Sequence, residues 1–188
     1  MARARRRWIR EQGLLDPARL VFFDETSVNT NMVRPNGWGP RGVRLVGHVP
    51  MAHWQTLTFI AGFRQTGIVA PMVIKGAMNG QTFLAYIEQC VVPALKRRDI
   101  VVIDNVPFHK AAGVQKAIEA VGATLRYLPA YSPDLNPIEL VFHPLKAFLR
   151  KAAERTVDGL NRSVGSFVRA LVRSQCIEYF KHAGYKPV

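Results

Sequence analysis

Residues 18–28 read ARLVFFDETSV, an apolar, β-rich run that ends in two acids, Asp24 and Glu25. Polar and apolar residues hardly alternate in it, which is typical of a strand buried on both faces. A second run of this kind, DIVVIDN at residues 99–105, also closes on an acid, Asp104. In α/β proteins the carboxyl ends of strands line the ligand crevice. The two runs therefore predict a sheet with carboxylates at one edge, although each aspartate alone also fits a capping or turn role.

The order of the remaining segments predicts the fold class. Two β-rich runs, at about 54–63 and 68–75, flank the turn RQTG and indicate an antiparallel pair. A short strand is expected at 124–130, and Asn79 and Thr156 are candidate helix N-caps. Helical spacing of apolar residues predicts helices within 79–98, 110–122, 136–154 and 156–173, and a short one before Gly184. This order predicts an α/β protein: a mixed five-stranded sheet, its first three strands antiparallel, with helices on both faces.

The composition favours a polyanionic partner. Lys and Arg total 26 against 13 Asp and Glu, a net charge of +13, which favours nucleic acid over a merely solvated basic surface. No apolar run reaches the roughly 18 residues that a membrane span needs. Cys90 and Cys176 lie far apart without a CxxC partner, so we expect neither a disulfide framework nor a zinc site, and a cytoplasmic location.

Residues 130–140, AYSPDLNPIEL, allow two interpretations of Glu139. Asn136 at an N-cap, Pro137 at the first helical position and Glu139 three residues after the cap approximate a capping box. Alternatively, the helix points Glu139 toward Asp24 and Asp104. Three converging carboxylates would hold two Mg²⁺ ions, because Mg²⁺ prefers hard oxygen ligands. The residues of this stretch alone do not choose between the two.

Three stretches together resemble the DDE transposases of the insertion-sequence 630 family, in the Tc/mariner superfamily. They are VFFDETSVNT at 21–30, VVIDNVPFHK at 101–110 and LRYLPAYSPDLNPIELVFHPLKAFLRK at 125–151. YSPDLNPIE is the most specific part, and the 34 residues between Asp104 and Glu139 are a spacing typical of the group. The resemblance runs from about Leu20 to Ala153.

The resemblance implies an RNase H-like fold and a catalytic set of Asp24, Asp104 and Glu139 that binds two Mg²⁺ ions, with Mn²⁺ as a substitute. It implies an endonuclease and transposase reaction, in which water cuts the transposon ends and the freed 3′-hydroxyl attacks target DNA. The expected partners are DNA and a second transposase subunit, in a bacterial-type, nucleoid-associated setting. Asn105 and His109 would lie beside the site, His109 as an auxiliary residue or in a local hydrogen bond. Glu25 should point to the opposite face of its strand and is not counted as a ligand.

Basic residues suggest two DNA contacts. Arg34, Arg41 and Arg44 punctuate the loop after the first strand, with Trp38 among them. The arginines would contact phosphates and the tryptophan an unpaired base, or the loop is solvated and Trp38 packs on the core. Further residues follow Glu139 at helical spacing, where they flank a DNA path or form a solvated helix face: Lys146, Arg150 and Lys151.

Two departures from the family pattern leave alternatives open. Only about 19 residues precede the first strand, so we expect a basic linker or helix remnant at 1–19, a catalytic domain at 20–188, and no helix-turn-helix region. Pro144 falls inside the predicted Glu139 helix, where an interior proline costs roughly 3 kcal/mol or produces a kink. The alternatives are a truncated, catalytically silent DNA-binding fragment and a standalone RNase H-like nuclease or resolvase.

Overall fold

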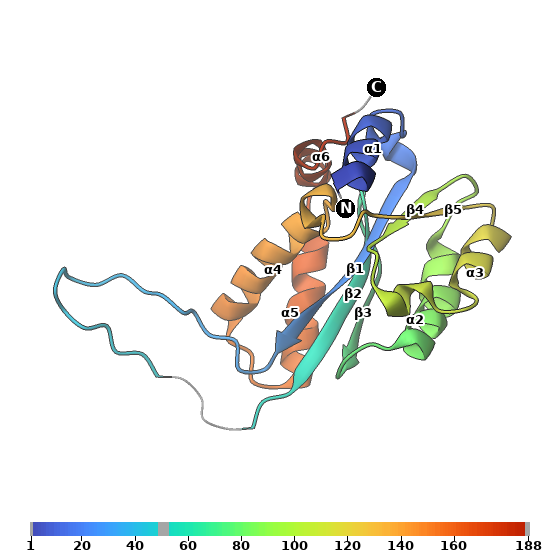
Figure 1. Cartoon of the computed structure of the whole chain (residues 1–188). Coiled ribbons are helices and arrows are strands. Elements are labelled where there is room, and N and C mark those ends of the chain that lie inside the picture. Colours follow the sequence, from blue (N-terminus) through green and yellow to red (C-terminus); the bar gives the residue numbers. More distant parts are fainter. Residues whose placement is uncertain (1, 49–52, 187–188) are drawn as a thin grey trace.

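The structure, a computed structural model, describes residues 2–48 and 53–186 and is built on one mixed sheet (Figure 1). Its strands are β1 (Leu20–Asn29), β2 (Thr56–Arg64), β3 (Gly67–Lys75), β4 (Ile100–Ile103) and β5 (Thr124–Tyr127), in the order β3-β2-β1-β4-β5. β1 to β3 pair antiparallel, whereas β4 runs parallel to both β1 and β5. The expected five-stranded mixed sheet with an antiparallel first trio is therefore confirmed.

The pairing register of β1 and β4 determines where the acidic residues at the ends of these strands lie relative to each other. Phe23 of β1 pairs with Ile103, the last residue of β4, in a parallel ladder. Asp24 and Asp104 are the residues that follow this pair along the two strands. Neighbouring strands lie about 4.8 Å apart. The register thus places the two aspartates side by side, as the matching strand ends predicted.

Helices cover both faces of the sheet (Figure 1). The bounds are α1 (Ala2–Gln12), α2 (Gly80–Tyr86), α3 (Val114–Ala120), α4 (Glu139–Ala152), α5 (Val157–Ala170) and α6 (Arg173–His182). Leu20 and Phe22 of β1 share a core with α4, α5 and α6, whereas Val21 and Phe23 pack with α2 and α3 on the other face. In the described part of the chain, no helix is long and apolar enough to cross a membrane.

Two of the three predicted helix caps are present. The side chain of Asn79 accepts a hydrogen bond from the Thr82 N–H, and that of Thr156 accepts one from the Gly159 N–H. The capping-box prediction for Asn136 is wrong, because α4 begins at Glu139 without a side-chain cap. Only the backbone carbonyl of Asn136 takes part in the helix start, accepting from the Glu139 N–H at 3.2 Å.

Pro144 lies inside α4, which continues through it to Ala152. A proline lacks the N–H that would bond four residues back, so Leu140 loses that partner for its carbonyl. Burial compensates, because Val141, Phe142, Leu145 and Leu149 of the same helix are all within the core. Packing therefore holds a helix that its backbone hydrogen bonds alone support less well.

The N-terminal helix α1 is docked on the body of the protein by a buried tryptophan. The Trp8 indole N–H donates to the Tyr185 hydroxyl at 3.0 Å, and that hydroxyl donates to the Leu135 carbonyl at 2.8 Å. Arg5 of α1 forms an ion pair with Asp134. Both sets of contacts involve residues of the loop that precedes α4. Helix α1 therefore packs against this loop and helps to hold its conformation.

Replacing Tyr185 by phenylalanine is expected to lower the free energy of unfolding by about 1–3 kcal/mol. The variant keeps the ring but leaves the Trp8 N–H and the Leu135 carbonyl buried without their shared partner. Thermal melting should show a loss of about 2–4 °C for each kcal/mol in a chain of this size. Tyr179→Phe, at a half-buried tyrosine of α6, is the matched control. Equal melting temperatures for Tyr185→Phe and the wild type would contradict the bridging role.

Candidate active site

One pocket of about 370 Å³ brings together the three acids singled out in the sequence. Asp24 comes from β1, Asp104 follows the end of β4, and Glu139 is the first residue of α4. The pocket is lined by Asp24, Asp104, Asn105, Val106, Pro107, Leu128, Pro129, Ala130, Tyr131, Ser132, Pro133, Asn136 and Glu139. Three chain segments far apart in sequence therefore meet at the edge of the sheet where β4 ends.

Asp24 is the most buried of the three acids, with 8% of its surface exposed. Its Oδ1 accepts from the Glu25 backbone N–H at 2.8 Å, and its Oδ2 accepts from Asn136 Nδ2 at 2.7 Å. Burial raises the pKa of Asp24 well above its ordinary value, and the negative charges of Glu25, Glu139 and Asp104 raise it further. The carboxylate is thus held in a fixed orientation in a place that disfavours its negative charge.

Asn136 is a site residue that the sequence did not reveal as one. Its side chain is 3% exposed and bonds to Asp24 across 112 residues of chain. Its Oδ1 is buried and accepts no hydrogen bond from any residue the structure describes. A buried acceptor without a donor is uncommon in folded proteins and frequently marks a ligand site. The sequence signal was ambiguous, because asparagine before Pro137 also fits a helix cap.

His109 links Asp104 to Glu25. The imidazole is fully buried, in a 3₁₀ turn at Pro107–Lys110; its Nδ1 contacts Asp104 Oδ1, and its Nε2 lies 3.1 Å from Glu25 Oε2. Burial lowers the pKa of His109, but the contacts with Asp104 and Glu25 outweigh burial and raise the pKa to about 9. His109 is therefore an imidazolium at neutral pH, paired with a carboxylate on each nitrogen. The hydrogen bond of His109 is therefore not a local one, because Glu25 lies 84 residues away in the sequence.

Glu139 is the exposed acid of the pocket. Partial burial raises its pKa, the charge of Lys146 lowers it, and the charges of Asp104 and Glu25 raise it. The negative charges of Asp104 and Glu25 therefore repel the Glu139 carboxylate, and the positive charge of Lys146 offsets part of this repulsion. Asn105 lies exposed at the rim, where it lines the pocket.

The donor set of the pocket suits a hard divalent cation. Three carboxylates and the side-chain oxygen of Asn136 border one space, and oxygen ligands are those that Mg²⁺ and Mn²⁺ take. A cation there would relieve the repulsion that raises the pKa of Asp24. Over residues 2–48 and 53–186, no three His, Cys, Asp or Glu side chains are placed so that they could hold a metal ion without rearrangement. Asp24, Asp104, Glu139 and Asn136 therefore fit a divalent cation in two respects: they offer oxygen ligands, and they line the same pocket.

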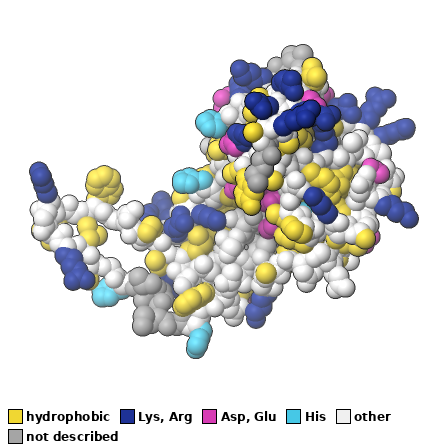
Figure 2. Space-filling view, in the orientation of Figure 1, with side chains coloured by type: hydrophobic (Ala, Val, Ile, Leu, Met, Phe, Trp, Pro, Cys, Tyr) yellow, Lys and Arg dark blue, Asp and Glu magenta, His cyan; other side chains and the backbone are white. Residues whose placement is uncertain are grey.

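Basic side chains predicted to contact DNA fall into two places. Arg34 and Arg150 line a hollow of about 470 Å³, together with Lys151 and Phe148, where the loop after β1 meets α4. Arg41 and Arg44 belong to the loop between β1 and β2, which extends away from the body of the protein (Figure 1), and Figure 2 shows basic side chains on this extension. Trp38 is fully exposed, so it does not pack on the core.

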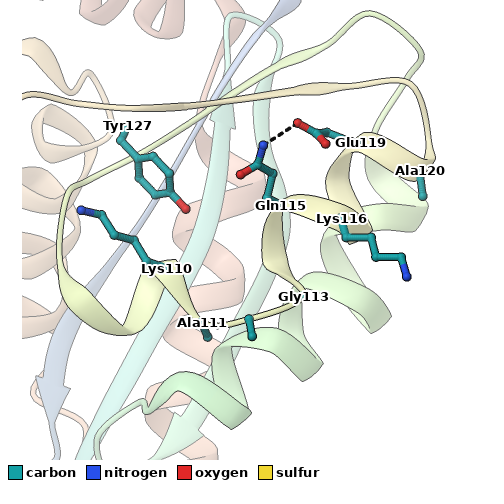
Figure 3. A pocket seen from close by; sticks show the side chains of 9 residues that line it. Lys110, Ala111, Gly113, Gln115, Lys116, Glu119, Ala120 and Tyr127 are labelled. Carbon is teal, nitrogen blue, oxygen red and sulfur yellow. Dashed lines mark hydrogen bonds between the residues drawn. The ribbon is translucent and has the colours of Figure 1, made fainter.

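A larger hollow, of about 820 Å³, is formed by α3, by the segment before it and by Tyr127 of β5 (Figure 3). Lys110, Lys116 and Tyr127 line it, and the Lys110 ammonium stands over the Tyr127 ring at 5.5 Å from its centre. Its only acid is Glu119, which accepts a hydrogen bond from Gln115. The hollow therefore lacks the cluster of acids that distinguishes the smaller pocket.

Residues 19–161 match the family model described as "DDE superfamily endonuclease". This stretch contains every acid of the pocket. No curated protein matches the chain.

Solved structures share the fold at low sequence identity. A pre-cleavage Mos1 transpososome aligns with 95% of this chain at a TM-score of 0.72 and 17% identity. The mariner Mos1 paired-end complex with Mg aligns with 98% at 0.71 and 18% identity, and the catalytic domain of Mos1 mariner transposase with 97% at 0.65 and 17%. The chain spans 54%, 59% and 88% of those chains. The likeness confirms the expected RNase H-like fold.

Proposed function

This chain belongs to the DDE superfamily of endonucleases, and we propose from this that it is a transposase catalytic domain of the insertion-sequence 630 type. The activity would be metal-dependent cleavage of DNA by water, followed by transfer of the new 3′-hydroxyl to target DNA. One observation carries the proposal. Asp24, Asp104 and Glu139 reach a single pocket from β1, from the end of β4 and from the start of α4.

The three carboxylates would bind the metal, and their neighbours would orient them. Two Mg²⁺ ions, or Mn²⁺ in their place, activate a water or 3′-hydroxyl and stabilise the leaving oxygen of a phosphodiester when bound in such a site. Asn136 Nδ2 and the Glu25 N–H fix the two oxygens of Asp24. His109 holds Asp104 on one side while Glu25 holds His109 on the other. Such contacts with neighbouring side chains keep metal ligands in one orientation.

Charge supports DNA as the partner. A net charge of +13 favours a polyanion, and the hollow lined by Arg34, Arg150 and Lys151 offers phosphate contacts beside α4. We propose that transposon ends and target DNA bind across this basic surface, with Trp38, Arg41, Arg44 and Lys146 as further contacts. A second subunit is part of the proposal, since two DNA ends must be joined.

The test is strand nicking of oligonucleotides that carry the inverted repeats flanking the gene. The wild type should nick in Mg²⁺ or Mn²⁺ and stop when a chelator is added. Asp104→Asn should lower the rate by about 10³-fold, because a bound metal ion stabilises the charge of the transition state in such reactions by several kcal/mol. Glu119→Gln, in the other hollow, is the matched control and should cut at the wild-type rate.

Two results would give a different function. Salt-sensitive DNA binding without any metal-dependent cleavage would leave a silent DNA-binding fragment. Preference for RNA–DNA hybrids or branched DNA over the terminal repeats would indicate a standalone nuclease or resolvase. Cleavage that survives Asp104→Asn or the chelator would remove the metal-site assignment itself.

A further inference from the structure

Tyr185, which follows α6, contacts both of the chain segments that meet at the carboxylate pocket. Its side chain is fully buried and is not part of the pocket lining. Its ring packs against Phe22 of β1, with 4.9 Å between the ring centres, and its hydroxyl donates to the Leu135 carbonyl at 2.8 Å. Asp24 follows Phe22 by two residues and lies on the same face of β1, whereas Leu135 directly precedes Asn136. One side chain therefore holds both the strand of Asp24 and the loop of Asn136.

Inside the pocket, the same two segments are joined by the hydrogen bond from Asn136 Nδ2 to Asp24 Oδ2 at 2.7 Å. The backbone before Asn136 is a 3₁₀ turn, Pro133–Leu135, and it is closed by the Asn136 N–H, which donates to the Pro133 carbonyl at 3.0 Å. Because this turn is short and internally bonded, a displacement of the Leu135 carbonyl also displaces Asn136. The contact at Leu135 thus helps to determine where the Asn136 amide lies relative to Asp24.

The direction of the hydrogen bonds at Tyr185 depends on α1. An indole N–H can only donate, whereas a tyrosine hydroxyl both donates and accepts. The Trp8 indole donates to the Tyr185 hydroxyl at 3.0 Å, so the proton of that hydroxyl is left for the Leu135 carbonyl. Trp8 is itself held by the Arg126 guanidinium, which stands 5.1 Å from the centre of the indole ring. Helix α1 therefore orients the hydroxyl that anchors the loop before α4.

We infer that Trp8 and Tyr185 are positioning residues of the carboxylate site, which hold Asn136 against Asp24 and thereby raise the affinity of the pocket for a divalent cation. The inference rests on the proposed function, because it requires that the acids bind a metal ion. Without the Tyr185 hydroxyl, the Leu135 carbonyl is buried without a donor, which is unfavourable. The loop can recover a partner only by moving this carbonyl toward water, and that movement takes the Asn136 amide away from Asp24. A metal ligand that has lost such a supporting contact binds its ion more weakly.

The test measures the binding of Mn²⁺ to the whole chain without DNA, from the electron paramagnetic resonance signal of the free ion. Mn²⁺ takes the same kind of oxygen ligands as Mg²⁺. Tyr185→Phe keeps the ring on Phe22 and should bind Mn²⁺ about 10-fold more weakly than the wild type. Trp8→Phe should also weaken binding, because the Tyr185 hydroxyl is then free to turn away from Leu135.

Tyr86→Phe is the matched control. The hydroxyl of the buried Tyr86 also donates to a backbone carbonyl, that of Ala70 in β3 at 2.7 Å, but Tyr86 belongs to the core on the opposite face of the sheet. This variant should lose as much thermal stability as Tyr185→Phe and still bind Mn²⁺ like the wild type. The comparison therefore separates positioning of the site from a general loss of stability.

A double-mutant cycle with Asn136→Ala tests whether Tyr185 acts through this residue. Asn136→Ala should itself weaken Mn²⁺ binding by about 10-fold, and adding Tyr185→Phe should cause no further loss. Equal affinities of Tyr185→Phe and the wild type for Mn²⁺, or full additivity in the cycle, would overturn the inference and leave the metal site of the proposed function intact. A wild type that binds no Mn²⁺ would overturn both.

Discussion

Asp24→Asn is expected to abolish metal-dependent cleavage, by about 10³-fold or more, and at the same time to raise the melting temperature in chelator. The loss of activity follows from replacing a charged oxygen ligand by a neutral amide. The gain in stability follows from the surroundings of Asp24, which is buried and repelled by Glu25, Glu139 and Asp104. Removing that charge should contribute about 1 kcal/mol, which is about 2–4 °C in a chain of this size.

Asn136 makes the substitution structurally tolerable. The new amide at position 24 keeps an oxygen for the Glu25 N–H and turns its NH₂ toward Asn136. Asn136 can rotate its amide by half a turn, so that Oδ1, unpaired in the wild type, accepts the new hydrogen bond. The variant thus keeps the hydrogen bond between positions 24 and 136, with donor and acceptor exchanged.

Melting curves with and without Mg²⁺ distinguish this account from simple misfolding. Wild-type stability should rise when Mg²⁺ is added, because an ion that binds only the folded state stabilises it, and Asp24→Asn should respond much less. Asp158→Asn, at an exposed acid of α5, should match the wild type in both readings. A variant that melts lower than the wild type in chelator would show that the Asp24 carboxylate is needed for the fold.

Asp99→Ala is expected to cause the largest loss of stability, about 3–5 kcal/mol. Arg64, the last residue of β2, is buried and bonds through Nη1 to Asp99 Oδ1 at 3.1 Å and through Nη2 to the Ala94 carbonyl at 3.2 Å. Asp99 also accepts from the Lys96 N–H at 2.6 Å. Without Asp99, the guanidinium charge stays buried with a single carbonyl as its partner.

Calorimetry or thermal melting checks this expectation against a matched exposed pair. Glu178→Ala breaks the surface ion pair with Lys181 and should cost no more than about 1 kcal/mol. The double variant Arg64→Met, Asp99→Ala removes both charges and should be more stable than Asp99→Ala alone. Equal melting temperatures for the single and double variants would show that the unpaired charge is not the cause.

Local sequence patterns were sufficient to predict the sheet and to predict that Asp24 and Asp104 lie at the same edge of it. Strand type, strand order and the acids that close β1 and β4 follow from runs of four to ten residues. The parallel pairing of Phe23 with Ile103 then brings Asp24 and Asp104 to one level without further information. Glu139 was placed by the resemblance, because its own residues fitted a helix start equally well.

Local patterns could not give the side-chain partners of the site acids, although the resemblance placed His109 beside the site. Asn136 bonds to Asp24 across 112 residues, and His109 lies near Glu25 across 84. No periodicity records which side chains meet at such separations. The exposure of Trp38 and the strained φ of Tyr131 belong to the same class, because loop conformation depends on contacts outside the loop.

The contacts of α1 bear on how other protein modules could be joined to this one. Trp8 bonds to Tyr185, and Gln12 Nε2 donates to the Gly184 carbonyl at 3.3 Å, so both ends of the described chain lie at one corner (Figure 1). Through Leu135 and Asp134, that corner touches the loop that leads into Glu139. A tether fixed at either end therefore starts next to the loop that leads to the carboxylate pocket and keeps whatever it carries at a high local concentration there.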